Sequence, residues 1–310
     1  MHKIFIDGSA GTTGLRIYDR LSLRSDIALV TLPDSERKDP VKRAAAINSS
    51  DIAFLCLPDD AAREAVSFVK NSDTVIIDTS TAHRTEPGWA YGFPELSNEH
   101  RDKLTHSKRI AVPGCHASGF IALVYPLVKN GFISSDTLLT CHSLTGYSGG
   151  GKKMIAQYEE DADNALLKAP RQYGITQNHK HLKEMVYVSG LENAPVFCPI
   201  VADFYSGMEV TVPLFGSQLE GGKTLEDIKS LYAESYKGNI VKYTEISDEN
   251  GFLSSAKVSG KDCMEISVFG NSDRILLTAR YDNLGKGASG AAIECMNLVM
   301  GTVPATGLEI

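Results

Sequence analysis

The chain has 310 residues, of which 43% are hydrophobic and 22% are charged, and its formal net charge is -7. These values are typical of a globular protein with about two domains. The negative balance argues against a nucleic-acid-binding protein, because no surplus of cations is available to neutralise phosphates. No apolar run approaches the ~20 residues that cross a bilayer, so no membrane association is expected.

Six cysteines are spread along the chain without a CxxC pair. Their spacing is typical neither of a disulfide framework nor of a zinc site, and free thiols indicate a reducing compartment. The first eight residues are too short for a signal peptide and predict a strand instead. We therefore expect a cytoplasmic protein that holds no metal.

Short apolar runs alternate with helical patterns over the first third of the chain. Buried strands are predicted at 3–8, 28–33, 51–58, 74–80 and 109–114. Helices are predicted between them at 14–24, 40–48 and 60–70. This alternation is typical of an α/β domain with a Rossmann-type doubly wound parallel sheet.

From about residue 136 the predicted strands are longer and fewer helices separate them. They are expected at 136–146, 197–206, 208–215, 257–269 and 274–282. The pairs divided at Gly207 and Gly270 predict antiparallel hairpins or bends, and 224–236 predicts an amphipathic helix. We expect an α+β domain with a mixed, largely antiparallel sheet. A small-residue helix is predicted last, at 287–301, with Ser289 as its N-cap.

A glycine-rich turn follows the first predicted strand. The motif GSAGTTG contains Gly8, Ala10, Gly11, Thr12, Thr13 and Gly14. Glycines let the backbone turn tightly and approach a pyrophosphate, which binds at a helix N-terminus. The spacing is G-x-x-G-x-x-G, so its place between a strand and a helix supports the interpretation as a dinucleotide site. A plain glycine turn is the alternative.

The end of the second predicted strand indicates which dinucleotide binds. An NAD site favours an acidic residue for the ribose 2′-hydroxyl, and Asp34 is available for it. Ser35, Arg37 and Lys38 instead offer a hydroxyl and two cations for a 2′-phosphate, which favours NADP. A solvated loop is the alternative for the two cations. Pro58, after the third predicted strand, is also expected to line the cofactor site.

Cys115 differs from the other cysteines in its position. It follows Pro113-Gly114 and opens a helical pattern, so its thiol is predicted at a helix N-terminus, where the dipole favours the thiolate. The other five cysteines lie in apolar runs and are expected to be buried and inert. Cys115 is therefore the candidate nucleophile.

A nucleophilic thiol also needs a group that transfers protons. The segment HKHLKE supplies His179 and His181, and Glu184 is placed to orient one imidazole. Both histidines stay open as the acid/base, with His181 slightly favoured because Glu184 lies nearer to it in sequence. Surface histidines are the alternative. His116 is adjacent to the thiol, but neighbouring residues at a helix start are expected to point apart.

Two further segments are candidates for binding the substrate's anionic groups. Ser148, Gly149 and Lys152 belong to a turn before a helix predicted at 152–163, which is typical of an oxyanion or phosphate site. Ser80 and Arg84 follow a predicted strand, at the edge where open α/β sheets bind ligands. Ordinary turn chemistry is the alternative for both segments.

Seven motifs, in this order along nearly the whole chain, carry a family resemblance: GSAGTTG, DTSTAHR, YGFPELS, AVPGCHASG, SGGGKK, HKHLKEM and DNLGKGASGAA. The chain resembles the N-acetyl-gamma-glutamyl-phosphate reductases, within the broader aspartate-semialdehyde dehydrogenase family, and their shorter length class. In the longer class Tyr-Pro-Thr follows the thiol, where this chain has His116-Ala117-Ser118. The resemblance implies NADPH-dependent reduction of N-acetyl-L-glutamyl 5-phosphate to the 5-semialdehyde and phosphate, in arginine biosynthesis, through a Cys115 thioester.

The resemblance also implies further assignments. It implies that Asn283 and Gly287 contact the nicotinamide end of the cofactor. The C-terminal helix returns to the NADP-binding domain, which comprises 1–115 and 286–310, while 116–285 bind substrate and form a homodimer or homotetramer. The alternatives are an aspartyl or aminoadipyl phosphate substrate and a non-catalytic NADP-sensing protein. Metal binding by Cys115 with the histidines has usable ligands but no ligand spacing.

Overall fold

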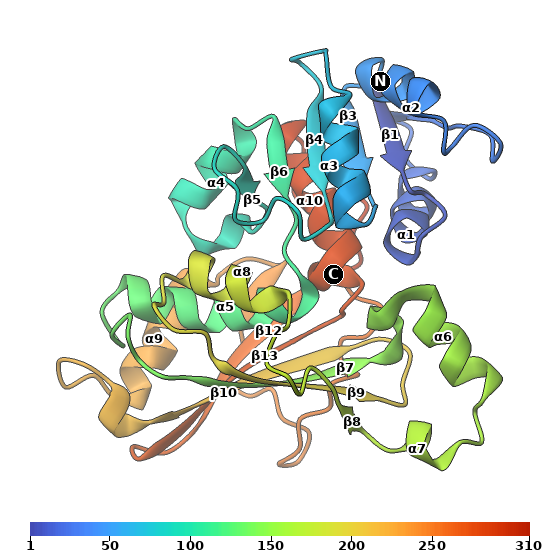
Figure 1. The fold of residues 1–310 in the computed structure, drawn as a ribbon. Coiled ribbons are helices and arrows are strands. Elements are labelled where there is room, and N and C mark those ends of the chain that lie inside the picture. The colour runs from blue at the N-terminus through green and yellow to red at the C-terminus, as the bar shows by residue number, and fades with distance from the viewer. The chain divides into compact units, whose positions relative to one another are not determined.

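The computed structural model describes residues 1–310 and divides them into two compact units. The first unit comprises Met1–Gly114 and Ala288–Leu308, and the second comprises Cys115–Gly287 and Glu309–Ile310. Figure 1 shows a sheet with helices in each of them.

The first unit contains a six-stranded sheet in which all neighbouring strands run parallel. In spatial order the strands are β2 (Ile27–Val30), β1 (His2–Asp7), β3 (Ile52–Leu55), β4 (Val75–Asp78), β6 (Arg109–Ala111) and β5 (Ala90–Tyr91). The chain moves outward from β1 first to one side and then to the other. This order is that of a doubly wound sheet, so the predicted fold class of this unit is confirmed.

Helices cover both faces of this sheet. They are α1 (Thr12–Leu21), α2 (Pro40–Asn48), α3 (Asp59–Ser67), α4 (Asn98–Thr105) and α10 (Gly290–Val299), with the 3-10 turn η1 (Pro94–Leu96). Ile4 and Ile6 of β1 share one core with residues of α1 and α10, whereas Phe5 shares another with residues of α2 and α3. Successive side chains of a strand point to opposite faces, which explains this division. The alanines of α10 allow it to pack closely there.

The second unit contains a seven-stranded mixed sheet. In spatial order its strands are β11 (Val241–Tyr243), β12 (Met264–Gly270), β13 (Arg274–Tyr281), β10 (Met208–Phe215), β7 (Thr140–Gly146), β9 (Val196–Ala202) and β8 (Arg171–Gln172). The pairs β7–β9 and β11–β12 are parallel and the remaining four are antiparallel. The predicted hairpin at Gly270 is confirmed. At Gly207 the predicted bend is found rather than a hairpin, because β7 lies between β9 and β10.

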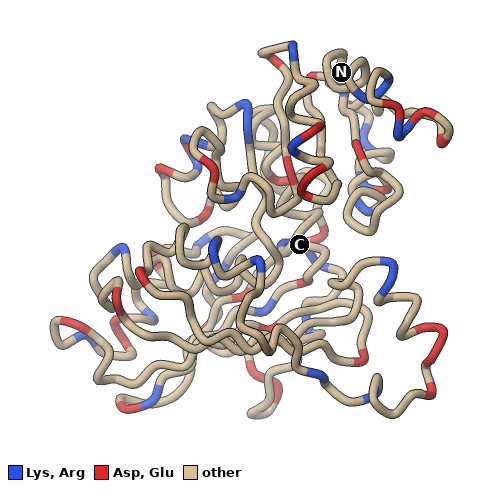
Figure 2. Tube along the Cα trace, in the orientation of Figure 1, with Lys and Arg blue, Asp and Glu red and all other residues tan.

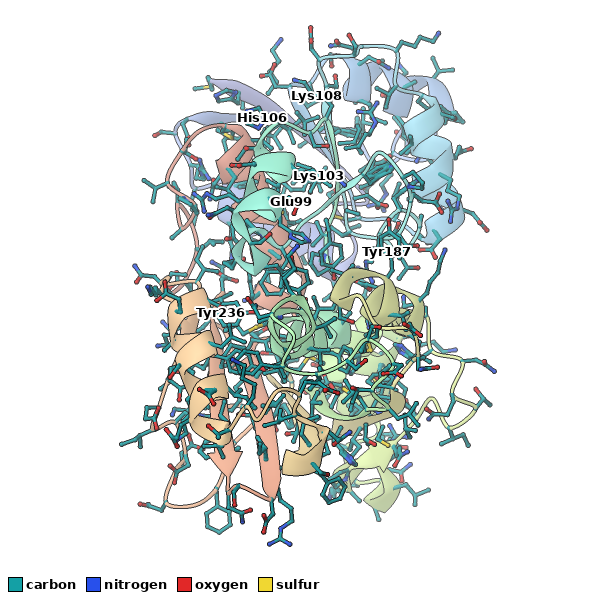
Figure 3. The ribbon with its side chains drawn as sticks, turned by 90° about the vertical axis from the view of Figure 1, so that its left-hand side faces the viewer. Glu99, Lys103, His106, Lys108, Tyr187 and Tyr236 are labelled. Carbon is teal, nitrogen blue, oxygen red and sulfur yellow. The ribbon has the colours of Figure 1, made fainter.

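The helix α5 (Cys115–Lys129) is buried along most of its length. Pro126 lies inside it and has no N–H to donate to the carbonyl of Ala122. Tyr236 donates its hydroxyl to that carbonyl at 2.6 Å, and Tyr232 donates to the carbonyl of Leu123. Figure 3 labels Tyr236 beside this helix. Tyr236 therefore satisfies the carbonyl that lacks a helical partner because of the proline, and Tyr232 adds a bond to the next carbonyl.

The other helices of the second unit are α6 (Gly151–Glu160), α7 (Ala165–Lys168), α8 (His181–Ser189) and α9 (Leu225–Ser235), with the 3-10 turns η2 (Tyr147–Gly150) and η3 (Gly216–Gln218) and the π turn η4 (Gly285–Ser289). Two predictions are wrong here. Residues 257–260 form a turn and 261–263 are irregular, so the strand predicted at 257–269 begins only at Met264. Ser289 does not cap α10 with its side chain, because the chain enters that helix from the π turn already in helical conformation.

Charged residues of both signs are interleaved along both units in Figure 2. None of the helices combines the length and apolarity required to cross a membrane.

Candidate active site

Cys115 is the first residue of α5, as predicted, and it is half-buried. Tyr281 of β13 donates its hydroxyl to the Cys115 carbonyl and accepts a hydrogen bond from the Gly119 N–H at 3.0 Å. A Cβ on Gly119 would lie 2.7 Å from that hydroxyl oxygen, so only glycine leaves room for it. Tyr281 therefore fixes the helical turn that carries the thiol, and no local sequence signal pointed to it.

Five aromatic rings gather next to this turn. The centroid of His116 lies 5.7 Å from those of His179 and His181, 5.3 Å from that of Phe197 and 6.0 Å from that of Tyr173. We call these five residues the ring cluster. The expectation that His116 points away from the adjacent Cys115 thiol stays a prediction, but its ring lies with those of the two other histidines. The fold of α8 and β9 against α5, which no local pattern reveals, brings the three imidazoles together.

Both nitrogens of His116 are hydrogen-bonded. Its Nδ1 lies 2.7 Å from the Ser143 hydroxyl, and its Nε2 lies 2.6 Å from the Tyr173 hydroxyl. Burial, with a smaller effect of the charge on His179, lowers the pKa of His116 to about 3. His116 is therefore a neutral imidazole with a single N–H at physiological pH.

The two histidines of the HKH segment have different surroundings. His179 is half-buried, whereas His181, the first residue of α8, is 4% exposed. The backbone N–H of His181 donates to His179 Nδ1 at 3.2 Å. Burial and the charge of Lys180 lower the pKa of His179. Glu184 is buried on α8, and its predicted role in orienting an imidazole stays a prediction.

Ser148, predicted to bind substrate, and Asn283, predicted to bind the cofactor, contact each other. Asn283 donates its amide to the Ser148 hydroxyl at 3.0 Å and accepts from the Gly207 N–H at 2.9 Å. Gly149 and Lys152 are exposed in the turn η2 and at the start of α6. The bond from Asn283 fixes Ser148, which lies in η2 next to the exposed Gly149.

Gly287 lies in the π turn η4. A Cβ at this position would lie 3.1 Å from the Cys115 Cβ. The backbone of the DNLGKG motif thus passes directly beside the candidate nucleophile. The assignment of Asn283 and Gly287 to the cofactor stays a prediction.

A cavity of about 490 Å³ lies at the carboxyl ends of β1, β2 and β3 in the first unit. Six of the predicted cofactor residues line it: Gly8, Ala10, Gly11, Arg37, Lys38 and Pro58. Thr12, Thr13, Gly14 and Ser35 do not. Gly14 has a packing role, because a Cβ there would lie 2.4 Å from the Gly8 carbonyl oxygen.

The charges around this cavity favour a 2′-phosphate over a free 2′-hydroxyl. Asp34, the acid considered for NAD, is not among the lining residues; it pairs with Arg37 at 3.3 Å and is exposed. Arg37 and Lys38 line the cavity. Asp7 also lines it, but its carboxylate is occupied by Arg43 at 3.0 Å. Burial raises the pKa of Asp7. The sequence patterns did not indicate that Asp7 lines this cavity.

Ser80 and Arg84 are engaged with the end of β4. Ser80 donates its hydroxyl to Asp78 at 2.7 Å, and His83 Nδ1 lies 2.6 Å from the same carboxylate. Arg84 donates to the carbonyls of Val112 and Thr79 at 2.9 and 3.1 Å. These bonds order the segment after β4, and the predicted contact of Ser80 and Arg84 with substrate stays a prediction.

Known proteins match both units. The family described as semialdehyde dehydrogenase, NAD binding domain, matches residues 3–104, and the semialdehyde dehydrogenase dimerisation domain matches residues 115–283. N-acetyl-gamma-glutamyl-phosphate reductase 2 of a Nostoc species is 45% identical over 99% of both chains. The reductase of Burkholderia lata is 44% identical over 96% of both chains. The chain belongs to the N-acetyl-gamma-glutamyl-phosphate reductase family. It is an oxidoreductase of the semialdehyde dehydrogenase type, as the resemblance of its motifs implied.

The fold extends to more distant proteins. Aspartate semialdehyde dehydrogenase II of Vibrio cholerae superposes with a TM-score of 0.72, at 14% identity, over 97% of this chain and 98% of that one. The predicted architecture of a parallel Rossmann-type sheet plus a mixed sheet is therefore confirmed. At this identity the likeness concerns the fold alone.

The other five cysteines differ in their burial. Cys141, Cys263 and Cys295 are buried, whereas Cys56 and Cys198 are half-buried, so the expectation that all five are buried is wrong for these two. Desolvation nevertheless raises the pKa of Cys56 to about 12, which keeps its thiol protonated and unreactive. No group of three or more His, Cys, Asp or Glu side chains has an arrangement that would hold a metal ion.

Proposed function

We propose that this protein reduces N-acetyl-L-glutamyl 5-phosphate to N-acetyl-L-glutamate 5-semialdehyde and phosphate, with NADPH as the reductant. The observation that carries the proposal is the half-buried Cys115 at the start of α5, beside a cluster of three histidines. A thiol at a helix N-terminus is placed for nucleophilic attack, because the dipole stabilises its thiolate. The curated relatives named for this reaction support the choice of substrate.

The chemistry begins with attack of the Cys115 thiolate on the carbonyl carbon of the acyl phosphate. A carbon–sulfur bond forms, and the carbon–oxygen bond to phosphate breaks with its electron pair on the leaving phosphate. Backbone N–H groups at the start of α5 are candidates to stabilise the oxyanion, worth about 3–4 kcal/mol per donor in comparable sites. The result is a thioester on Cys115.

Bound NADPH supplies the hydride that reduces this thioester. The cavity of the first unit would hold a dinucleotide at the glycine turn that follows β1. In this turn Gly8 has a φ of 86° and packs so closely on the Cys56 carbonyl that only glycine fits. Arg37 and Lys38 are the candidate partners of the 2′-phosphate. Reduction gives a thiohemiacetal, which collapses to the aldehyde and releases the Cys115 thiolate.

The proton transfers are assigned to the pair His179 and His181. We favour His179 as the acid/base, because it is half-buried whereas His181 is almost fully buried. A residue that exchanges protons with substrate must be accessible to it. Glu184 is assigned an orienting role, and Ser148, Gly149, Lys152, Ser80 and Arg84 are the candidates to bind the substrate's anionic groups.

We also propose that the protein is a homo-oligomer in the cytoplasm. The match of residues 115–283 to a dimerisation domain supports a homodimer or homotetramer built through the second unit. The six cysteines are all free thiols, which suits a reducing cytoplasm.

The reverse reaction provides the test. Phosphate-dependent reduction of NADP or NAD is measured with N-acetylglutamate semialdehyde, aspartate semialdehyde and aminoadipate semialdehyde. We expect turnover with the acetylated five-carbon substrate and NADP. Preference for aspartate or aminoadipate semialdehyde would contradict the substrate, and tight NADP binding without any turnover would favour a sensing protein.

A further inference from the structure

The side chain of Gln177 is paired with the backbone of Phe197 on β9. The Phe197 N–H donates to Gln177 Oε1 at 2.9 Å, and Gln177 Nε2 donates to the Phe197 carbonyl at 2.8 Å. The edge strand β8 ends at Gln172, and Tyr173 makes the next bond to β9, to the Pro199 carbonyl. Alternate residues of a strand direct their backbone groups to the same side, so Phe197 faces the edge beyond the end of β8. The amide of Gln177 therefore takes the place of a strand backbone there.

This pairing is made from an unusual backbone conformation. Gln177 has a φ of 57°, in the left-handed region, and the only other residue with a positive φ that is not glycine is Asn250. The Cβ of an L residue makes this region unfavourable. Such conformations persist where surrounding bonds hold them, and they concentrate at functional sites. The two bonds to Phe197 and the bond from the Gln177 N–H to the Gly174 carbonyl, at 2.9 Å, hold this one.

His179 lies two residues after Gln177 and contacts the same residue of β9. Its ring centroid lies 5.1 Å from that of Phe197, with the two planes at 65°. Phe197 is 1% exposed, so its ring is fixed by packing, while its backbone holds the Gln177 amide. A closed path of contacts thus leads from Gln177 along the chain to His179, across the two rings and back. The position of the His179 ring is therefore coupled to the amide.

A hydrogen bond to His179 decides which of its nitrogens exchanges protons. The backbone N–H of His181 donates to His179 Nδ1 at 3.2 Å, so Nδ1 is an acceptor and carries no proton. Burial and the charge of Lys180 lower the pKa of His179, which is therefore a neutral imidazole with its proton on Nε2. An acid/base at this position acts through Nε2.

We propose that Gln177 is a positioning residue for the acid/base. Its amide, paired with the Phe197 backbone, holds the His179 ring so that Nδ1 accepts the backbone hydrogen bond and Nε2 remains for proton transfer. This role deepens the proposed function, on which it rests for the assignment of His179. It explains why an unfavourable backbone conformation is found two residues before the histidine.

The test compares two substitutions that both remove the amide but differ in backbone strain. Gln177→Met keeps the side-chain length and the positive φ, whereas Gln177→Gly relieves the strain. The tautomer and titration of His179 are measured in the full chain by NMR of histidine labelled at its ring nitrogens, with His179→Asn assigning the signals. We expect both variants to lose the single Nε2–H tautomer and to raise the pKa of His179 toward the ordinary value of a histidine.

Kinetics and stability provide the second readout on the same variants. We expect kcat to fall about tenfold in both, with KM changed less than about twofold, because a misplaced acid/base loses part of its contribution to the chemical step. The unfolding free energy should fall more in Gln177→Met than in Gln177→Gly, because glycine adopts a positive φ without cost. A merely structural role would make kcat follow stability, whereas a positioning role makes it follow the amide.

Asn250→Gly is the matched control. It relieves the other positive φ, of 53°, in an exposed turn of the same unit. It is expected to leave the His179 signals and kcat unchanged. Circular dichroism establishes that each variant is folded, and if Gln177→Met is not, Gln177→Gly decides.

Unchanged His179 signals in either Gln177 variant would overturn the proposal, as would equally large changes in Asn250→Gly. Changed signals with wild-type kcat would also overturn it, because the orientation of His179 would then not matter for proton transfer. The NMR measurement needs no substrate. Failure to reduce N-acetylglutamyl phosphate would therefore contradict the proposed function, while the His179 signals would still decide whether Gln177 fixes this ring.

Discussion

The cavity of the first unit and the ring cluster of the second are assembled in opposite ways. The cavity is lined mainly by three short stretches of chain, at 5–11, 29–43 and 56–61, each following a parallel strand. The ring cluster contains residues 116, 173, 179, 181 and 197, and its His116 is hydrogen-bonded to Ser143. The first depends on backbone conformation and the second on side chains from distant elements. Substitutions should therefore damage the two regions differently.

The largest effect is expected at the thiol. Replacing Cys115 with Ala removes the nucleophile and should lower kcat by a factor on the order of 10⁶, as in other covalent catalysts. NADPH affinity, measured by fluorescence, should not change. Cys263→Ala is the matched control, because this thiol lies outside the cavity, burial raises its pKa, and it should be dispensable. Near wild-type turnover in Cys115→Ala would contradict the thioester mechanism.

The histidine pair is expected to show the next largest effect. His179→Asn should lower kcat by about 10²–10⁴, the usual contribution of an acid/base, and should flatten the pH profile of kcat. His181→Asn should lower kcat less and retain the profile, because its ring is buried against His179 at 4.7 Å. A larger loss with a flattened profile in His181→Asn would reverse the assignment.

The glycine turn tests the importance of backbone conformation. Gly8→Ala puts a Cβ 2.3 Å from the Cys56 carbonyl oxygen at a φ of 86°. Gly88→Ala is strained in the same way, with a φ of 83°, but its Cβ meets nothing within 4 Å. The strain alone costs about 1–3 kcal/mol. We expect Gly8→Ala to lose more unfolding free energy than Gly88→Ala in denaturant titrations, and also to lose NADPH binding. Equal losses would show that the close approach is unimportant.

The smallest effect is expected at Arg37, one of the cations that line the cavity. Arg37→Gln should raise the KM for NADPH about tenfold and leave that for NADH unchanged, because one charge-assisted hydrogen bond to the 2′-phosphate is lost. Arg63→Gln, on the exposed side of α3 and outside the cavity, controls for the change in net charge. If the KM values for NADPH and NADH rise equally in Arg37→Gln, this arginine does not select NADP.

The sequence by itself determined the features that are local. Gly8 and Gly11 after a strand, Arg37 and Lys38 after the next one, and Cys115 at a helix start all lie where the patterns placed them. Their positions depend on residues within a few places along the chain, and the conformational preferences of glycine and of helix termini act over that range.

Only the tertiary structure decided the surroundings of the thiol. Sheet register places Ser143 opposite Pro199 and Tyr173 beside it, and α5 brings His116 between them. Tyr281 reaches the Cys115 turn across 166 residues. No local pattern encodes which side chains of separate strands and helices meet, because strand order and register are set by burial of the whole sheet. The alternation of β7 buries Ser143, but the sequence does not reveal that His116 is its partner.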